Sequence, residues 1–168
     1  MRRKEGDMSK DATMKLGAGV AAPSFALPGD AGAKITLKNF KDRKLVLYFY
    51  PKDDTSGCTR EAIDFNRLKG EFEKAGAAIV GVSPDSPASH AKFKAKHGLE
   101  LELASDETKA MLEAYGVWAE KSMYGRKYMG VERTTFLIER DGTIAQVWNK
   151  VKVPGHAEAV LAAAQALK

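Results

Sequence analysis

The order of predicted elements indicates an α/β protein in which helices cover a mixed β-sheet. Two uninterrupted apolar runs, at residues 45–50 and 78–82, are typical of strands buried on both faces. A helical pattern follows each run, and a β-hairpin pattern comes near the C-terminus. Strands that alternate with helices in this way pack as layers around a mixed sheet.

The first buried strand ends at Pro51, and a short polar loop separates it from a helix. Apolar residues recur in that helix at spacings of three and four, as on one face of an α-helix, and Gly76 is a plausible end. The apolar positions are Ala62, Phe65, Leu68 and Phe72.

After the second buried strand, Ser86 and Pro87 provide an N-cap and a first-turn proline, which predict a helix through about His97. The remaining predicted elements are a strand at 101–104, a helix at 107–115, a hairpin of strands 135–138 and 144–148 around Asp141-Gly142, and a closing helix at 156–167.

Length and composition predict one soluble domain. The chain has 168 residues, of which 44% are hydrophobic and 29% charged. Residues 1–13 are polar and unpatterned, which predicts a mobile arm, and residues 14–168 form the expected domain.

The charge pattern argues against nucleic-acid and membrane functions. The net charge is only +5, and a nucleic-acid site would need more positive charge on one face, with stacking aromatics among it, than the basic segment 34–44 offers. No apolar stretch has the length of a membrane span, and no apolar run follows the basic N-terminus as in a secretory signal. We therefore expect a cytoplasmic protein.

Cys58 is the only cysteine, which excludes an intramolecular disulfide and a cysteine-based zinc cluster. It stands where the polar loop turns into the first helix. The free N–H groups and the positive dipole end of a helix N-terminus stabilise a thiolate, the reactive form of cysteine. A free cysteine is more often a small buried hydrophobe, but the polar loop Thr-Ser-Gly-Cys-Thr is a poor place for one.

The neighbours of this thiol suggest how it is activated. Thr55, three residues earlier, is positioned to donate its hydroxyl proton to the sulfur, and Gly57 permits close approach of the backbone. Pro51 fixes the exit from the strand and withholds an N–H, which shapes a cover over the pocket. Asp53 and Asp54 would raise the pKa of the thiol if they faced it, so we expect both to point outward.

Residues 51–58 read Pro-Lys-Asp-Asp-Thr-Ser-Gly-Cys, which matches the P-x-x-x-T-x-x-C signature of peroxiredoxins. The wider string YFYPKDDTSGCTREAIDF closely resembles the Q-type, or bacterioferritin-comigratory, subfamily. The similarity runs from about Lys15 to the C-terminus and includes segments 81–86, 115–118 and 133–138. It implies a thioredoxin-like fold with a mixed central sheet flanked by helices.

The resemblance also implies a reaction and further site residues. Arg133 matches the family arginine that enters the pocket from the start of a late strand, and Glu61 matches a glutamate that supports the helix N-terminus or orients the arginine. In such a site the Cys58 thiolate attacks hydrogen peroxide or an organic hydroperoxide and becomes a sulfenic acid. Thr55, Arg133 and backbone N–H groups near Gly57 hold the peroxide oxygens. The resemblance implies no metal or organic cofactor.

The sequence departs from the family at the resolving cysteine. Relatives carry it five residues after the reactive one or on the next helix, positions that correspond here to Ile63 and approximately Lys94. The sulfenic acid must therefore be reduced by an external thiol such as thioredoxin, glutaredoxin or glutathione. Resemblance to the Q-type group favours a monomer.

Two other functions for the thiol remain open, a non-enzymatic peroxide sensor and a redox-regulated chaperone. A thiol-disulfide oxidoreductase would need Cys-x-x-Cys, but position 61 is Glu. A cysteine–histidine hydrolase would need a histidine near the thiol. We expect His90 and His97 to be solvated, because they lie on a lysine-rich helix, and His156 is distant in the sequence. None of the three histidines has the spacing of metal ligands.

Aromatic residues gather shortly before Arg133. Tyr115, Trp118 and Tyr124 are expected in the core or at its rim, with Trp118 lining the pocket. The stretch from Met123 to Met129 is a candidate for a mobile loop that contacts substrate.

Overall fold

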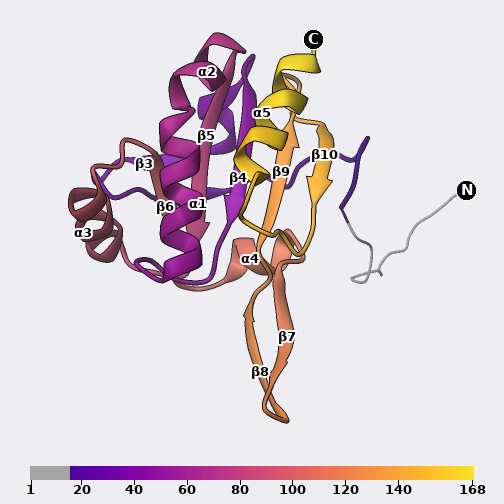
Figure 1. Ribbon diagram of the computed structural model, residues 1–168. Coiled ribbons are helices and arrows are strands. Elements are labelled where there is room, and N and C mark those ends of the chain that lie inside the picture. The colour runs from indigo at the N-terminus through magenta and orange to yellow at the C-terminus, as the bar shows by residue number, and fades with distance from the viewer. Residues whose placement is uncertain (1–15) are drawn as a thin grey trace, which may run out of the picture.

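The computed structural model describes residues 16–168, so the expected arm at residues 1–13 lies outside the described residues. A five-stranded sheet forms the centre, in the order β10-β9-β4-β5-β6 (Figure 1). β4 pairs in parallel with β5 and antiparallel with β9, so the sheet is mixed as predicted. The strands are β4 (Lys44–Phe49), β5 (Ala77–Ser83), β6 (Glu102–Ser105), β9 (Thr134–Ile138) and β10 (Ile144–Trp148).

Strand β4 is central because, after Lys44, its side chains are hydrophobic on both faces. All six of its residues are buried, and Leu47 pairs with Val80 on one side and with Phe136 on the other. Alternate residues of β4 enter two separate hydrophobic clusters, as the two-residue period of a strand requires.

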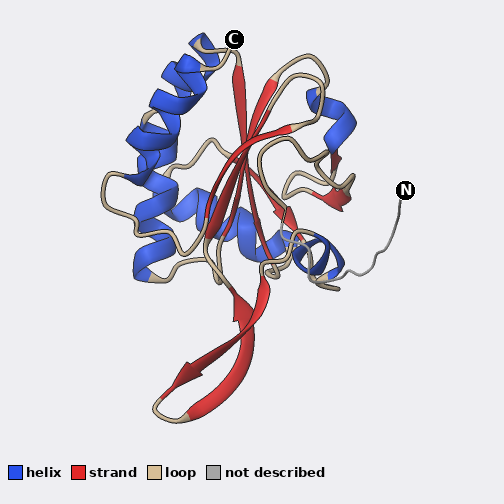
Figure 2. Ribbon diagram, turned by 90° about the vertical axis from the view of Figure 1, so that its right-hand side faces the viewer, coloured by secondary structure: helices blue, strands red, loops and turns tan. Residues whose placement is uncertain are grey.

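Helices cover both faces of the sheet (Figure 2). The cluster that contains Tyr48 and Cys58 lies under α1 (Ser56–Arg67), α2 (Lys69–Lys74) and α5 (His156–Ala166). The other cluster contains Leu47 and Phe49 and is closed by α4 (Ala110–Ala114), the 3-10 helix η3 (Leu37–Phe40) and the hairpin of β2 (Ala26–Pro28) and β3 (Lys34–Thr36). Helix α3 (Pro87–His97) packs against β6.

The predicted helices are present with shifted ends. The Ser86 side chain accepts a hydrogen bond from the Ser89 N–H, which confirms the N-cap of α3. The helix expected at 107–115 begins only at Ala110, because Lys109 adopts a left-handed conformation with φ 68°. The single helix expected before Gly76 divides at Leu68 into α1 and α2.

Residues 118–131 form a hairpin that projects from the body of the molecule, made of β7 (Trp118–Met123) and β8 (Arg126–Val131) (Figure 1). The mobile loop suggested for Met123 to Met129 is therefore wrong. Tyr124 and Gly125 make the two-residue turn, and both have positive φ, 53° and 76°. Such turns match the twist of the flanking strands and hold them in register.

Candidate active site

Cys58 is the third residue of α1, beyond the carboxyl end of β4, and only 1% of its surface is exposed. The helix begins after Thr55, which has extended backbone angles, and its first internal hydrogen bond runs from the Thr59 N–H to the Thr55 carbonyl at 2.8 Å. The preceding N–H groups therefore have no intrahelical acceptor. The thiol lies at the positive end of the helix dipole, as the sequence predicted.

Arg133 reaches the sulfur from a segment 75 residues away in the sequence. It immediately precedes β9, and its Nη2 donates to Cys58 Sγ at 3.4 Å. Its Nη1 donates to Glu61 Oε1 at 2.6 Å. Glu61 is one helical turn after Cys58, so the guanidinium is held between a thiol and a carboxylate of the same helix.

The pair of Glu61 and Arg133 is largely removed from water. Burial raises the pKa of Glu61 to about 7, although the charge of Arg133 and its hydrogen bond oppose the rise. Burial alone would lower the pKa of Arg133, but the charges of Glu61 and Cys58 outweigh that effect and raise it. The arginine therefore supplies a permanent positive charge beside the sulfur.

Gly57 makes room for this arginine. A Cβ atom at position 57 would lie 3.3 Å from Arg133 Nη2, closer than most side chains approach. The missing side chain at Gly57 thus leaves space that the Arg133 guanidinium fills.

Thr55 does not donate to the sulfur here. Its hydroxyl donates instead to the Lys52 carbonyl at 2.9 Å, and a hydroxyl has only one proton to give. The predicted hydrogen bond from Thr55 to the sulfur is thus absent here. Thr55 is the exposed N-cap residue of α1, and its side chain closes the turn that follows Pro51.

Trp118 is not brought to the sulfur. It begins β7 and packs against the cluster on the other face of the sheet from Cys58, with Lys109 Nζ 5.5 Å from the centre of its ring. Trp118 therefore does not line a pocket at Cys58, as predicted, but packs at the base of the β7–β8 hairpin.

Tyr48 is a neighbour of the site that sequence reasoning missed. Its ring stacks on Phe65 of α1 at 4.7 Å, and its buried hydroxyl has no hydrogen-bond partner among the described residues. Burial, followed by the charges of Glu61 and Cys58, raises the pKa of Tyr48 well above its ordinary value. Alternation along the first strand, which places positions 46, 48 and 50 on one face, was the available signal.

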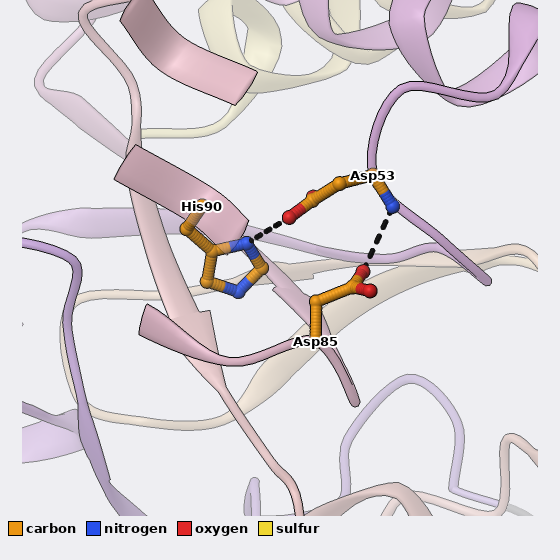
Figure 3. A group of neighbouring side chains, drawn as sticks. All are labelled: Asp53, Asp85 and His90. Atoms are coloured by element: carbon orange, nitrogen blue, oxygen red, sulfur yellow. Dashed lines mark hydrogen bonds and ion pairs between the residues drawn. The ribbon is translucent and has the colours of Figure 1, made fainter. Parts of the chain in front are cut away.

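Asp53 points inward, contrary to expectation. Its carboxylate accepts from the Tyr50 hydroxyl at 2.6 Å and from the Ser89 hydroxyl at 2.8 Å. It also lies 2.7 Å from His90 Nδ1 (Figure 3). Asp54 does point outward, to Lys96 and His97.

His90 is completely buried, so the solvated position expected for it is wrong. Its Nε2 lies 3.1 Å from the Ala104 carbonyl, while Nδ1 faces Asp53. Each ring nitrogen thus faces an oxygen acceptor. Although α3 is rich in lysine, the fold packs His90 against Asp53 and buries both side chains.

Asp53, Asp85 and His90 are close enough together to be considered as metal ligands (Figure 3). Asp85 Oδ2 already accepts hydrogen bonds from the Asp53 N–H at 2.8 Å and from the Ser83 hydroxyl at 2.7 Å. Because these oxygens have protein donors, the cluster is accounted for as a hydrogen-bond network that fixes the loop before α1.

Comparison with known proteins places the chain in a family. Residues 18–147 match the model of the AhpC/TSA family. Peroxiredoxin Bcp of Xanthomonas campestris is 49% identical over 156 residues, covering 93% of this chain and 96% of that protein. Peroxiredoxin Bcp of Bacillus subtilis is 46% identical over 155 residues, covering 92% of this chain and 97% of that protein.

Solved structures agree. The bacterioferritin comigratory protein of Xanthomonas campestris superposes with a TM-score of 0.84 at 48% identity, covering 89% of this chain and 98% of that one. A cysteine-to-serine mutant of Xylella fastidiosa PrxQ gives a TM-score of 0.86 at 39% identity, covering 91% of this chain and 98% of that one. The sequence matches and the shared thioredoxin-like fold show the family, and the single cysteine at the start of α1 shows the form. The chain belongs to the AhpC/TSA family as a one-cysteine peroxiredoxin of the Q type.

Proposed function

We propose that Cys58 is the peroxide-reacting nucleophile of this thiol-dependent peroxidase. The observation that carries the proposal is the contact between Arg133 Nη2 and Cys58 Sγ at the N-terminus of α1. A fixed cation contacts the sulfur, and the sulfur lies at the positive end of a helix; both effects stabilise a thiolate.

In the first step the thiolate attacks the terminal oxygen of the peroxide. A sulfur–oxygen bond forms as the oxygen–oxygen bond breaks, and the leaving oxygen takes up a proton to depart as water or an alcohol. Arg133 and the N–H groups at the start of α1 stabilise the negative charge that moves to this oxygen. Reduction of alkyl peroxides is described for the Xanthomonas campestris protein. We extend it to this chain, together with reduction of hydrogen peroxide.

The remaining site residues have supporting roles in this proposal. Glu61 holds the guanidinium in place through the 2.6 Å hydrogen bond, and Gly57 leaves the space it needs. Pro51 fixes the turn after β4. Thr55 reaches the peroxide only if its hydroxyl leaves the Lys52 carbonyl, so we assign it to the substrate complex rather than to the resting site.

In the second step an external thiol reduces the sulfenic acid. The thiol sulfur bonds to Cys58 Sγ and water leaves; a second thiol then attacks the mixed disulfide and releases the Cys58 thiolate. The chain has no second cysteine to replace this partner. Thioredoxin, glutaredoxin and glutathione are the candidate reductants.

We further propose that residues 14–168 act as a single domain, as a monomer and in the cytoplasm. No helix among residues 16–168 is both long enough and apolar enough to cross a membrane.

The proposal is tested by peroxide consumption with dithiothreitol as reductant. Wild-type protein should consume many equivalents of peroxide, and Cys58→Ser should consume none above background. Ser56→Ala, a change at an exposed position two residues earlier, is the matched control and should keep full turnover. Turnover by Cys58→Ser would contradict the proposal. Wild-type protein that stopped after about one equivalent would instead be a sensor, because a sensor has no catalytic cycle.

A further inference from the structure

The projecting β7–β8 hairpin carries most of the exposed large hydrophobic side chains of residues 16–168. Four of the six lie on it, and Tyr124 at its tip is 97% exposed. The four are Met123, Tyr124, Tyr128 and Met129. An isolated two-stranded hairpin is marginally stable in water, and grouped exposed apolar side chains usually mark an interaction surface.

One face of the hairpin combines two of these apolar groups, Met123 and Tyr128, with positive charge, while Met129 pairs with Glu120 on the opposite face. Lys121 pairs with Tyr128 across the strands and Met123 pairs with Arg126, so all four side chains lie on the same face. A Cβ atom on Gly130 would lie 3.4 Å from Lys121 Cδ and 3.5 Å from Tyr128 Cε2, which places both side chains over that glycine. We call these four residues the basic–apolar face; it contains no acidic side chain.

This face is close along the chain to Arg133, the residue that contacts the reactive thiol. β8 ends at Val131, two residues before Arg133, whose guanidinium lies 3.4 Å from Cys58 Sγ. Tyr128 is five residues from Arg133, a distance of at most about 17 Å along an extended strand. A folded domain of roughly 100 residues, with a radius of gyration of about 13 Å, can cover both.

We propose that the basic–apolar face docks a protein thiol reductant whose surface around its reactive thiol is apolar and acidic. This inference rests on the proposed function, because the sulfenic acid on Cys58 needs two external thiols. The first forms a disulfide with Cys58 Sγ as water leaves, and the second attacks the partner's sulfur and returns Cys58 to the thiolate. Pairing of this face with the same face of a second copy is disfavoured, because it would bring Lys121 and Arg126 against the same cations.

The test compares a protein reductant with a small one. Steady-state peroxidase rates are measured with thioredoxin, recycled by thioredoxin reductase and NADPH, and separately with dithiothreitol. In the double variant Met123→Thr/Tyr128→Thr we expect kcat/KM for thioredoxin to fall about tenfold, as for loss of interface anchors. The rate with dithiothreitol should be unchanged, because that thiol needs no docking surface.

Val20→Thr is the matched control, since Val20 is an exposed apolar residue whose backbone bonds to Ile144 of β10. It should leave both rates unchanged. Arg126→Glu should also lower kcat/KM for thioredoxin, and raising the salt concentration should lower it for the wild-type protein.

Equal rates for the double variant and the wild-type protein with thioredoxin would overturn the docking proposal. A parallel loss with both reductants, or wild-type protein that thioredoxin does not reduce, would overturn it as well. Failure of the proposed function is a separate result, in which wild-type protein consumes no peroxide even with dithiothreitol.

Discussion

Arg133 contacts two groups of different kind, the thiol of Cys58 at 3.4 Å and the carboxylate of Glu61 at 2.6 Å. The planar guanidinium satisfies both through separate nitrogens, which a lysine ammonium on a flexible stem does not reproduce. The same residue is therefore fixed in position by one partner and acts electrostatically on the other.

Arg133→Lys should slow oxidation of the sulfur by about 10²-fold while keeping the charge, a loss comparable to removal of one transition-state donor. Arg133→Ala should slow it further. The second-order rate constant is measured by rapid mixing with hydrogen peroxide, followed by tryptophan fluorescence. An unchanged rate constant in Arg133→Lys would show that the two-point geometry is unnecessary.

Glu61 makes stability depend on pH. Its pKa is about 7 in the folded protein against an ordinary value of 4.5, so the folded state binds this proton more tightly. The stability gained from tighter proton binding at Glu61 is fully present below pH 4.5 and is lost as the pH rises through about 7. The loss amounts to at most about 3 kcal/mol of unfolding free energy.

Glu61→Gln removes this titration. The difference in unfolding free energy between the variant and wild-type protein, measured in urea at pH 5 and pH 8, should therefore shift in favour of the variant at pH 8. A difference that stays constant between the two pH values would contradict the raised pKa.

Sequence reasoning identified the residues that act locally. Cys58 and Gly57 are adjacent in the chain to the strand and helix that position them. The contact of Arg133 with the sulfur was reached only through family resemblance, because it joins residues 75 positions apart. The burial of His90 was missed, since it depends on a contact with Asp53, 37 residues away, that no local pattern reveals.

At the scale of elements, the turn between β4 and α1 is tied to α3. Asp53 in the turn and His90 in the helix are 0–4% exposed at their side chains and 2.7 Å apart. The neighbouring hydrogen bonds from Tyr50 and Ser89 hold the same carboxylate. This network sets the direction in which α1 starts and hence the position of its N-terminus.

His90→Leu should destabilise the protein by about 3 kcal/mol, because it leaves the buried Asp53 carboxylate without its partner on α3 and the Ala104 carbonyl without the His90 ring nitrogen. His97→Leu on the same helix is the control. It breaks a more exposed pair with Asp54 and should cost less than about 1 kcal/mol. Urea unfolding at pH 7 measures both, and equal losses would show that the buried pair has no special weight.

Most elements could be predicted because their patterns are strong. The two continuous apolar runs became β4 and β5, and Ser86-Pro87 began α3. The β7–β8 hairpin was missed because its turn is Tyr124-Gly125 rather than Asn-Gly and its strands are mostly exposed, so they lack apolar alternation.

At the scale of the whole molecule, the fold supplies the groups for the first step of the proposed cycle, oxidation of Cys58, and not for its reduction. The sheet and its two helical layers bring Cys58, Glu61 and Arg133 together from two distant segments, while the chain has no second cysteine. The mixed sheet could be predicted from the order of the elements. Sequence patterns did not reveal the exposed β7–β8 hairpin, and they do not identify the external reductant.

The central claim is that peroxide oxidises Cys58 to a sulfenic acid that persists until an external thiol arrives. The most direct measurement is intact-mass and peptide mass spectrometry after one equivalent of hydrogen peroxide, without reductant and with the sulfenic-acid trap dimedone. We expect a single dimedone adduct, located on Cys58, and its disappearance when dithiothreitol is added before the trap. Peroxide consumption with no adduct on Cys58, or with the adduct on another residue, would contradict the claim.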